Sequence, residues 1–278
     1  MNGAREVKLA AGWALPTLGF GTWTLKEGEE TVRAVTAALE AGYRSIDTAA
    51  YYGNEASVGE AIRHAAIPRA DIRVTTKVWN DCQGYDEALR AFEASQRRLD
   101  VGAVDLLLIH WPCPKQDRYV QTWKALERLY REGQARAIGV SNFEPEHLDR
   151  LAQTCEMAPM VNQVQMNVLF QQPQMLEDGR RRGLVVQAWR PLQKGGTVLR
   201  HPVVADIAAK HGATAAQVAL RFLLQQGAAV IAKSTHPDRM RENLGAFDLR
   251  LEREDMQRLL DLNQGEAARS GLAPRDMD

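Results

Sequence analysis

The chain has 278 residues, of which 45% are hydrophobic and 25% are charged, a balance typical of a globular protein that buries a sizeable core. The 35 basic and 35 acidic residues give a formal net charge of zero, which excludes a global field that attracts nucleic acid or an anionic membrane. No apolar stretch approaches the roughly 20 residues that cross a bilayer, and residues 1–10 lack the apolar core of a signal peptide. We therefore expect a cytoplasmic monomer without nucleic-acid or membrane partners.

The cysteines and one basic run are the first places where a bound ion would be sought. Cys82, Cys113 and Cys155 are an odd number with no CxxC pair, so the sequence predicts reduced thiols and neither a disulfide framework nor a metal site. The run from Arg180 to Arg182 ends a short helical stretch, where cations suit the negative end of the helix dipole. We expect this run to be a solvated face and not a phosphate site.

Short runs of β-branched and apolar residues alternate with amphipathic segments of helical length along the whole chain. Residues 29–42 illustrate the helical segments, because Val35 and Leu39 fall on one face and Gly42 supplies a stop. No linker interrupts the eight rounds, so the sequence predicts one α/β domain over residues 1–278, folded as a closed (β/α)8 TIM barrel. The expected strands are residues 18–21, 45–48, 74–78, 106–110, 137–140, 162–165, 185–188 and 230–232.

Two segments lie outside these rounds. Residues 7–16 predict a β-hairpin that turns at Ala11 and Gly12 and plugs one end of the barrel. Residues 252–263 predict an extra C-terminal helix, with Met256 and Leu259 in its apolar set. The polar tail that follows is expected either to be mobile or to reach the pocket.

Three polar residues close neighbouring strands and are hard to explain as ordinary core: Asp47, Lys77 and His110. The intervals between them each span one helix and one strand, the size of one βαβ step. In a barrel, the C-terminal ends of the strands face one rim, where barrel enzymes place their chemistry. One such residue alone would favour a buried ion pair or a core histidine, whereas three in phase favour a site. We expect these side chains to converge.

Tyr52 lies five residues after Asp47, in a loop that can fold over the same rim, and Tyr51 offers a competing phenol. A free phenol has a pKa of about 10, and an adjacent ammonium lowers it. Lys77 is the expected cation, oriented by Asp47, while His110 hydrogen-bonds a substrate carbonyl. This arrangement suits carbonyl reduction, in which a cofactor supplies hydride and the tyrosine protonates the developing alkoxide.

The sequence contains no GxGxxG motif between a strand and a helix, so a Rossmann dinucleotide site is not supported. Barrels can instead bind phosphate after strands seven and eight, at a helix N-terminus. After the last strand, Ser234 or Thr235 can cap a helix. Lys233 and Arg239 add positive charge there, which fits equally an anion-binding site or a well-capped surface helix. If the segment binds phosphate, its two cations indicate the 2′-phosphate of NADP and not NAD. Trp189 is large enough to stack on a nicotinamide ring, although a buried tryptophan is more often core.

The order of four stretches carries a family resemblance: GYRSIDTAAYYGNE, LLLIHWP, GVSNF and KSTHPDRMRENL. Together they resemble the aldo-keto reductase family over nearly the whole chain, and the short loop after His110 is similar to that of bacterial members related to 2,5-diketo-gluconate reductases. The resemblance implies a barrel oxidoreductase that reduces aldehydes or ketones to alcohols with NADPH. It also selects Tyr52 over Tyr51 as the proton donor that acts with Asp47, Lys77 and His110.

The resemblance implies further contacts at both ends of the cofactor. Ser141 and Asn142 match positions at the nicotinamide carboxamide, and Arg239 matches a position at the adenosine 2′-phosphate. The residues implied to hold the cofactor are Gly21, Thr22, Ser141, Asn142, Gln163, Trp189, Arg190, Leu192, Lys233, Ser234, Thr235, Arg239, Glu242 and Asn243. The residues expected to line the substrate pocket are Trp23, Tyr51, Trp79, His110 and Trp111.

Four positions depart from the family pattern, namely Gln165, Asn167, Arg190 and Ala232. They affect local cofactor contacts and loop geometry and not the chemistry.

Two other functions fit the same barrel. A regulatory module would keep the NADP site without turnover, against which the complete set of four catalytic residues argues. An isomerase or aldolase would use Lys77 as a Schiff base, which an adjacent carboxylate disfavours by keeping the lysine protonated.

Overall fold

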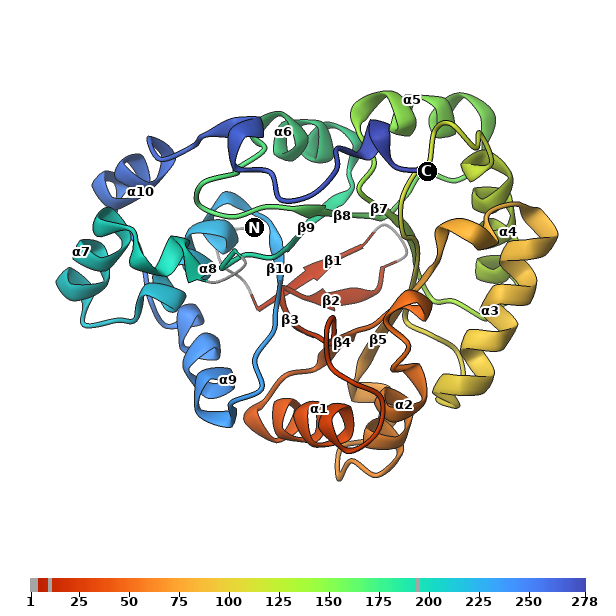
Figure 1. Ribbon diagram of the computed structural model, residues 1–278, viewed down its shortest axis with the longest axis horizontal. Coiled ribbons are helices and arrows are strands. Elements are labelled where there is room, and N and C mark those ends of the chain that lie inside the picture. The colour runs from red at the N-terminus through yellow and green to blue at the C-terminus, as the bar shows by residue number, and fades with distance from the viewer. Residues whose placement is uncertain (1–4, 10–11, 194–195) are drawn as a thin grey trace.

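The computed structural model describes residues 5–9, 12–193 and 196–278. Eight parallel strands close into a barrel in the order β10-β3-β4-β5-β6-β7-β8-β9, and Figure 1 shows the helices around its outside. The predicted barrel is confirmed, and each strand lies within one residue of its expected bounds because the apolar runs are short and sharply bounded. The strands are β3 (Leu18–Gly21), β4 (Ser45–Asp47), β5 (Arg73–Val78), β6 (Leu106–Ile109), β7 (Ile138–Ser141), β8 (Val161–Gln165), β9 (Val185–Trp189) and β10 (Ala229–Ala232).

The helices alternate with the strands and end where the sequence signals them. The first helix stops at Gly42, whose left-handed φ of 114° suits glycine and whose N–H donates to the Leu39 carbonyl. Within the described residues, none of the helices is long and apolar enough to cross a membrane. They are α1 (Glu29–Ala41), α2 (Glu55–Arg63), α3 (Tyr85–Leu99), α4 (Tyr119–Arg131), α5 (Pro145–Thr154), α6 (Pro173–Arg182), α7 (Pro202–His211), α8 (Ala215–Gln226), α9 (Pro237–Leu244) and α10 (Arg253–Leu260).

A short antiparallel hairpin, β1 (Glu6–Lys8) and β2 (Ala14–Pro16), closes the N-terminal end of the barrel. Leu15 of this hairpin packs in one apolar cluster with Leu106, which begins β6. Figure 1 shows the hairpin across the middle of the ring of helices. The predicted plug is thus present, while its expected turning point at Ala11 lies outside the described residues.

The end of the chain forms the expected extra helix and then returns to the C-terminal rim of the barrel. Helix α10 begins after Glu252 and ends at Leu260, so it is shorter than the predicted segment. Figure 1 shows the tail passing α6 on its way to the C-terminus. Asn80 Nδ2 donates to the Asp278 carbonyl at 3.2 Å. Of the two expectations for the tail, contact with the rim is the one that the structure shows.

The local predictions for cysteines and for the basic run have different outcomes. All three cysteines are free thiols, as predicted. The solvated face predicted for the basic run holds for Arg180 and Arg181 and is wrong for Arg182. Only 19% of the Arg182 side chain is exposed, and it lies 2.6 Å from Asp178 and 2.5 Å from Asp149. The reason is tertiary: the last turn of α6 faces α5, which supplies Asp149 as a partner.

The contact between α2 and α3 predicts a strong effect of one methyl group. A Cβ atom added at Gly59 of α2 would overlap the carbonyl oxygen of Leu99 at the end of α3. We expect Gly59→Ala to lower the free energy of unfolding by about 1–3 kcal/mol, because backbone atoms cannot move aside as a side chain would. Urea denaturation measures this. Glu60→Ala on the exposed side of the same helix is the control and should change stability by no more than about 0.5 kcal/mol. Equal stability of the two variants would contradict the close approach.

Candidate active site

The buried pair of Asp47 and Lys77 is the centre of the site. Lys77 Nζ lies 2.6 Å from Asp47 Oδ1, and both side chains are almost completely buried. The ammonium also donates to the Thr48 carbonyl at 2.9 Å and to the Tyr52 hydroxyl at 3.2 Å. All three N–H groups of Lys77 therefore have partners, as a buried cation requires.

Strand register brings these residues to one rim. Asp47 ends β4, and Lys77 is the penultimate residue of β5. His110 follows β6 directly, and its N–H continues the ladder by donating to the Val78 carbonyl at 3.0 Å. Tyr52 lies on a single 3-10 turn, η1 (Ala50–Tyr52), between β4 and α2. The structure thus brings together the four side chains whose spacing along the sequence suggested convergence.

His110 sits among aromatic rings. Its ring centroid lies 5.6 Å from that of Tyr52 and 4.9 Å from that of Trp79, in edge-on arrangements. The residue is 7% exposed, and Nδ1 is buried without a hydrogen-bond partner in the described part of the chain. Aromatic packing, and not a hydrogen bond at Nδ1, therefore holds this ring in place.

Burial and neighbouring charges set the protonation states of the cluster. Burial raises the pKa of the Tyr52 phenol, and this outweighs the lowering by the Lys77 ammonium. The expectation that Lys77 would bring the pKa of Tyr52 below its usual value is therefore wrong in net direction, because it counted the charge and not the burial. Burial lowers the pKa of Lys77, but Asp47 and Tyr52 together more than offset this, so the pKa is raised. Burial and the Lys77 charge hold the pKa of His110 well below its usual range.

At neutral pH the site therefore combines a protonated phenol, an ammonium ion and a neutral imidazole. Each state has a clear use. A protonated Tyr52 can give a proton away, a charged Lys77 can stabilise the phenolate that remains, and a neutral His110 can hydrogen-bond without competing as an acid. The arrangement is that of a general acid supported by a cation.

Aromatic rings form the mouth above this cluster. The ring of Tyr51 stacks on Trp79 with centroids 3.7 Å apart and on Trp23 with centroids 5.5 Å apart. Trp23 is 40% exposed and Tyr51 is 50% exposed, which is unusual for rings of this size and favours contact with a ligand. Trp111, the next residue after His110, is half-buried, and its carbonyl accepts from Gln83 Nε2 at 2.7 Å.

The residues predicted near the nicotinamide gather beside Asp47. Gln163 Nε2 donates to Asp47 Oδ2 at 2.7 Å, and the Ser141 hydroxyl donates to the Gln163 carbonyl at 2.8 Å. Trp189 Nε1 donates to Asn142 Oδ1 at 2.9 Å. These polar atoms are hydrogen-bonded to one another and to Asp47, so the cluster is preorganised next to the Asp47–Lys77 pair.

The segment after β10 presents two cations without carboxylate partners. Lys233 and Arg239 are exposed, and neither forms an ion pair with another described residue. Arg241 on the same helix differs, because it pairs with Asp238 at 2.6 Å. Two unpaired cations beside the start of α9 fit the phosphate end of a dinucleotide.

Helix α9 is capped differently from the prediction. Its N-cap is His236, because Pro237 occupies the first helical position. The Ser234 hydroxyl accepts the His236 N–H at 3.1 Å, and Thr235 is exposed. Neither Ser234 nor Thr235 is the cap.

Two other predicted cofactor residues in α9 contact the scaffold. Asn243 is 4% exposed, and its side chain hydrogen-bonds Tyr43. Glu242 is half-buried, and its carbonyl accepts from Gln217 Nε2 at 2.9 Å. These contacts fix the helix that carries Arg239.

The loop after β3 lies close to the Asp47 backbone. The Thr22 hydroxyl donates to the Asp47 carbonyl at 3.0 Å. A Cβ atom at Gly21 would lie 2.7 Å from a methyl carbon of Ile231, so only glycine fits between β3 and β10. Leu192, in the loop after β9, is partly buried against the main core. These three predicted residues lie around the rim, with Gly21 and Thr22 nearest the site.

Comparison with known proteins decides the family. Residues 17–264 match the Aldo/keto reductase family. The chain belongs to this family. The resemblance noted in the sequence is therefore confirmed.

Named relatives span nearly the whole chain. It is 47% identical over 252 residues to the 9,11-endoperoxide prostaglandin H2 reductase of Trypanosoma cruzi. This alignment covers 90% of this chain and 88% of the relative. It is 44% identical over 260 residues to the glyoxal reductase of Bacillus subtilis, covering 94% and 93%. Among solved structures, a mutant of Gox0644 in complex with NADPH has a TM-score of 0.93 at 41% identity and covers 98% of both chains.

Two departures from the aldo-keto reductase pattern meet at the C-terminal tail. Gln165 Oε1 accepts the Ser270 N–H, and Arg190 Nη1 donates to the Ser270 hydroxyl, both at 3.1 Å. Arg190 has a left-handed φ of 53°, and its guanidinium lies 5.2 Å from the Trp189 ring centroid. These two departures therefore attach the tail to the rim.

The other two departures have local roles. Asn167 Oδ1 accepts the N–H groups of Leu169 and Phe170 at 2.9 and 3.1 Å, which shapes the turn after β8. Ala232 is 1% exposed and pairs with Phe20 in the ladder between β10 and β3. Neither residue touches the catalytic cluster directly.

Sequence reasoning missed two members of the network. The Thr48 carbonyl is a partner of Lys77, and a backbone atom carries no residue-type signal that could have revealed it. Gln187 is completely buried in β9, and its Oε1 accepts from Gln163 at 2.9 Å. A polar residue in the middle of an apolar strand was the signal for Gln187.

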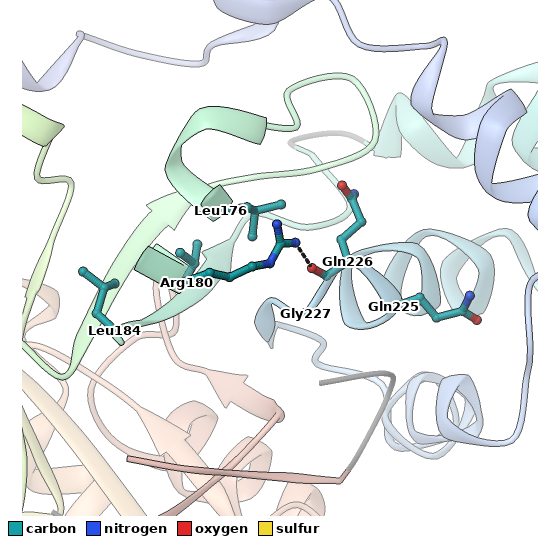
Figure 2. Close-up of a pocket in the computed structure, with 7 residues that line it drawn as sticks. Leu176, Arg180, Leu184, Gln225, Gln226 and Gly227 are labelled. Atoms are coloured by element: carbon teal, nitrogen blue, oxygen red, sulfur yellow. Dashed lines mark hydrogen bonds between the residues drawn. The ribbon is translucent and has the colours of Figure 1, made fainter. Parts of the chain in front are cut away.

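A hollow on the outside of the barrel lies apart from this site. Figure 2 shows it between α6 and α8, with Leu176 and Leu184 in its lining. There Arg180 Nη2 donates to the Gln226 carbonyl at 2.8 Å. The lining includes none of the predicted catalytic or cofactor residues, so this hollow is separate from the candidate site at the rim.

The buried imidazole predicts a pH dependence of stability. In the unfolded chain His110 takes up a proton near its usual pKa of about 6.5, whereas the folded pKa lies well below this. The stabilising contribution is therefore complete above about pH 6.5 and is lost as pH falls, at up to about 1.4 kcal/mol per pH unit. We expect His110→Gln to flatten the fall in unfolding free energy between about pH 7 and 5, as measured by urea denaturation. The exposed His64→Gln is the control. A wild-type slope in His110→Gln would contradict the neutral buried state.

Proposed function

We propose that the protein reduces aldehyde or ketone carbonyls to alcohols with NADPH, and that Tyr52 donates the proton. The observation that carries this proposal is the contact of Tyr52 Oη with Lys77 Nζ at 3.2 Å, with Asp47 on the other side of the ammonium at 2.6 Å. A phenol, a cation and a carboxylate in this order form a proton donor and not a nucleophile.

The proton moves from Tyr52 Oη to the carbonyl oxygen. NADPH, when bound, supplies the hydride for the carbonyl carbon. Lys77 then faces the phenolate that the proton leaves behind and stabilises its charge, while Asp47 keeps Lys77 in place. General acid catalysis of this kind contributes about 10²- to 10⁴-fold. The raised pKa of Tyr52 keeps the donor protonated at neutral pH.

His110 orients the carbonyl. Its imidazole is neutral because burial lowers its pKa, so it can donate one hydrogen bond to the carbonyl oxygen without releasing a proton of its own. Its edge-on packing against Trp79 limits rotation of the ring. Orientation by a fixed donor lowers the barrier because no reorganisation is needed during the reaction.

The cofactor fits along the rim from β7 to α9. Trp189 offers a ring face for the nicotinamide, and Ser141, Asn142 and Gln163 lie around it. Lys233 and Arg239, unpaired in the described residues, fit the 2′-phosphate of NADPH. Gox0644, of similar structure, binds NADPH in a solved complex. The remaining contacts proposed along this path are Gly21, Thr22, Arg190, Leu192, Ser234, Thr235, Glu242 and Asn243.

Small or flat carbonyl compounds suit the aromatic mouth. Trp23, Tyr51 and Trp79 present ring faces above the cluster, and ring faces favour planar groups. We propose methylglyoxal and substituted benzaldehydes as substrates. Two relatives carry the names glyoxal reductase and methylglyoxal reductase DkgA, at 44% and 39% identity. Schiff-base chemistry at Lys77 is disfavoured, because the raised pKa keeps this amine protonated.

The role of Tyr52 predicts the effect of removing one oxygen atom. We expect Tyr52→Phe to lower kcat/KM for methylglyoxal by at least about 100-fold, because general acid catalysis is lost. NADPH binding, followed by fluorescence titration, should be retained. Tyr119→Phe, at a buried tyrosine outside the site, is the control. Wild-type turnover in Tyr52→Phe would remove Tyr52 from its role, and a larger loss in Tyr51→Phe would identify Tyr51 as the acid.

The cofactor assignment predicts a selective effect at α9. We expect Arg239→Ala to weaken NADPH binding by about tenfold to a hundredfold, because a charge-assisted contact to the 2′-phosphate is lost. NADH lacks this phosphate, so its Kd should change little. Arg241→Ala removes a neighbouring arginine that already pairs with Asp238, and it should not discriminate between the two cofactors. Equal losses of NADPH and NADH in Arg239→Ala would refute the 2′-phosphate site.

A further inference from the structure

The two residues at the end of the GYRSIDTAAYYGNE stretch, Asn54 and Glu55, have no role in the chemistry above. Both are buried, at 0% and 1% exposure. They directly follow the loop that carries Tyr52. A buried amide and a buried carboxylate are costly unless their hydrogen bonds are satisfied, so their partners indicate what they hold in place.

Glu55 connects three elements on the outside of the barrel wall. It is the first residue of α2, and its Oε1 accepts from the Thr76 hydroxyl of β5 at 2.5 Å. Its Oε2 accepts from Arg98 Nε of α3 at 2.8 Å. Both carboxylate oxygens therefore have donors, and the side chain is completely buried.

The contact with Thr76 lies directly behind the catalytic lysine. Thr76 and Lys77 are neighbours in β5, and successive side chains of a strand point to opposite faces. Lys77 points into the barrel toward Asp47, whereas Thr76 points toward the helices and meets Glu55. The hydrogen bond from Thr76 to Glu55 thus ties the strand of the cation to the residues that follow the proton donor.

Asn54 holds the same loop from the rim side. Its Nδ2 donates to the Thr22 and Leu25 carbonyls, both at 3.0 Å. Its Oδ1 accepts from the Thr48 hydroxyl at 2.8 Å, and the Thr48 carbonyl is itself a partner of Lys77. Asn54 therefore joins the two ends of the loop of Tyr52 to each other and to the loop after β3.

Packing alone gives the loop less support on the helix side. A small, partly open pocket between β5 and α3 is lined by Ala50, Val78, Phe92 and Arg98 among others. Its walls lack packing neighbours on the open side, so the residues around it depend more on their polar contacts. Ala50 begins the 3-10 turn that ends at Tyr52.

We propose that Glu55, acting through the Thr76 hydroxyl, is a positioning residue that sets the separation between Tyr52 Oη and Lys77 Nζ. This inference rests on the proposed role of Tyr52 as the proton donor. A displacement of about 1 Å between catalytic groups can cost about 100-fold in rate, so a residue that fixes this distance governs the chemical step without touching the substrate.

The test removes the hydroxyl of Thr76 without changing the shape of the side chain. We expect Thr76→Val to lower the single-turnover rate of NADPH oxidation about tenfold. The Kd of NADPH and the KM of the carbonyl should stay at wild-type values. Thr76→Ser keeps the hydroxyl and should restore the rate to within about twofold. Glu55→Gln should lower the rate as well, and the double variant should be no slower than Glu55→Gln alone, because both changes break one contact.

The matched control is a buried carboxylate that contacts the other end of β5. Asp105 is a completely buried carboxylate that accepts the Val74 N–H at 2.9 Å and pairs with Arg69 at 2.7 Å. Asp105→Asn should lower the melting temperature at least as much as Thr76→Val and leave the single-turnover rate unchanged. This comparison separates positioning from general stability.

Three results would overturn the inference. A wild-type rate in Thr76→Val would show that the contact does not position the pair. Equal rate losses in Thr76→Val and Thr76→Ser, or a rate loss in Asp105→Asn that follows its melting temperature, would reduce Glu55 to a structural residue. If the wild type itself fails to oxidise NADPH with any carbonyl, the proposed function fails first and the inference fails with it.

Discussion

The rest of the structure depends on one constraint, a lysine ammonium buried in the wall of the barrel. Removing one partner from a buried ion pair typically costs about 3–5 kcal/mol, so Lys77 and Asp47 must stay together in the folded state. Their contact is 2.6 Å long and joins the ends of β4 and β5. Because the ammonium has three donors, it also determines where the Thr48 carbonyl and the Tyr52 hydroxyl lie. A requirement for folding and a requirement for chemistry are therefore met by the same atoms.

The barrel brings polar side chains from other strands to this ion pair. Parallel strands bring residues that are about one βαβ step apart to the same rim, and the site draws on the ends of β4, β5, β6, β7, β8 and β9. Asp47 receives Lys77 on one oxygen and Gln163 on the other, at 2.6 and 2.7 Å. The carboxylate thus links the proton donor to the residues proposed to surround the nicotinamide. Changes on the cofactor side can reach Tyr52 through this single group.

The sequence predicted what depends on local pattern and missed what depends on burial or on distant contacts. The alternation of apolar runs placed the strands within one residue, and polar residues at strand ends predicted the side chains that the rim brings together. The net pKa direction of Tyr52 was wrong, because burial is known only once the fold is known. The attachment of Ser270 to Gln165 joins residues 105 positions apart, and no periodicity connects them. The cap of α9 was misplaced although Pro237 already indicated it.

The aromatic mouth has a consequence for how the protein can acquire new substrates. Tyr51 stacks on both Trp23 and Trp79 above the rim, whereas Thr76 and Glu55 meet on the opposite side of the barrel wall. The rings of Trp23 and Trp79 also pack against those of Tyr52 and His110, each with centroids 4.9 Å apart, so an exchange at either position also changes the support of a side chain in the cluster. Tyr51 lies farther from the cluster, with its ring centroid 6.2 Å from that of His110, and it is therefore the natural first position to vary in a focused library.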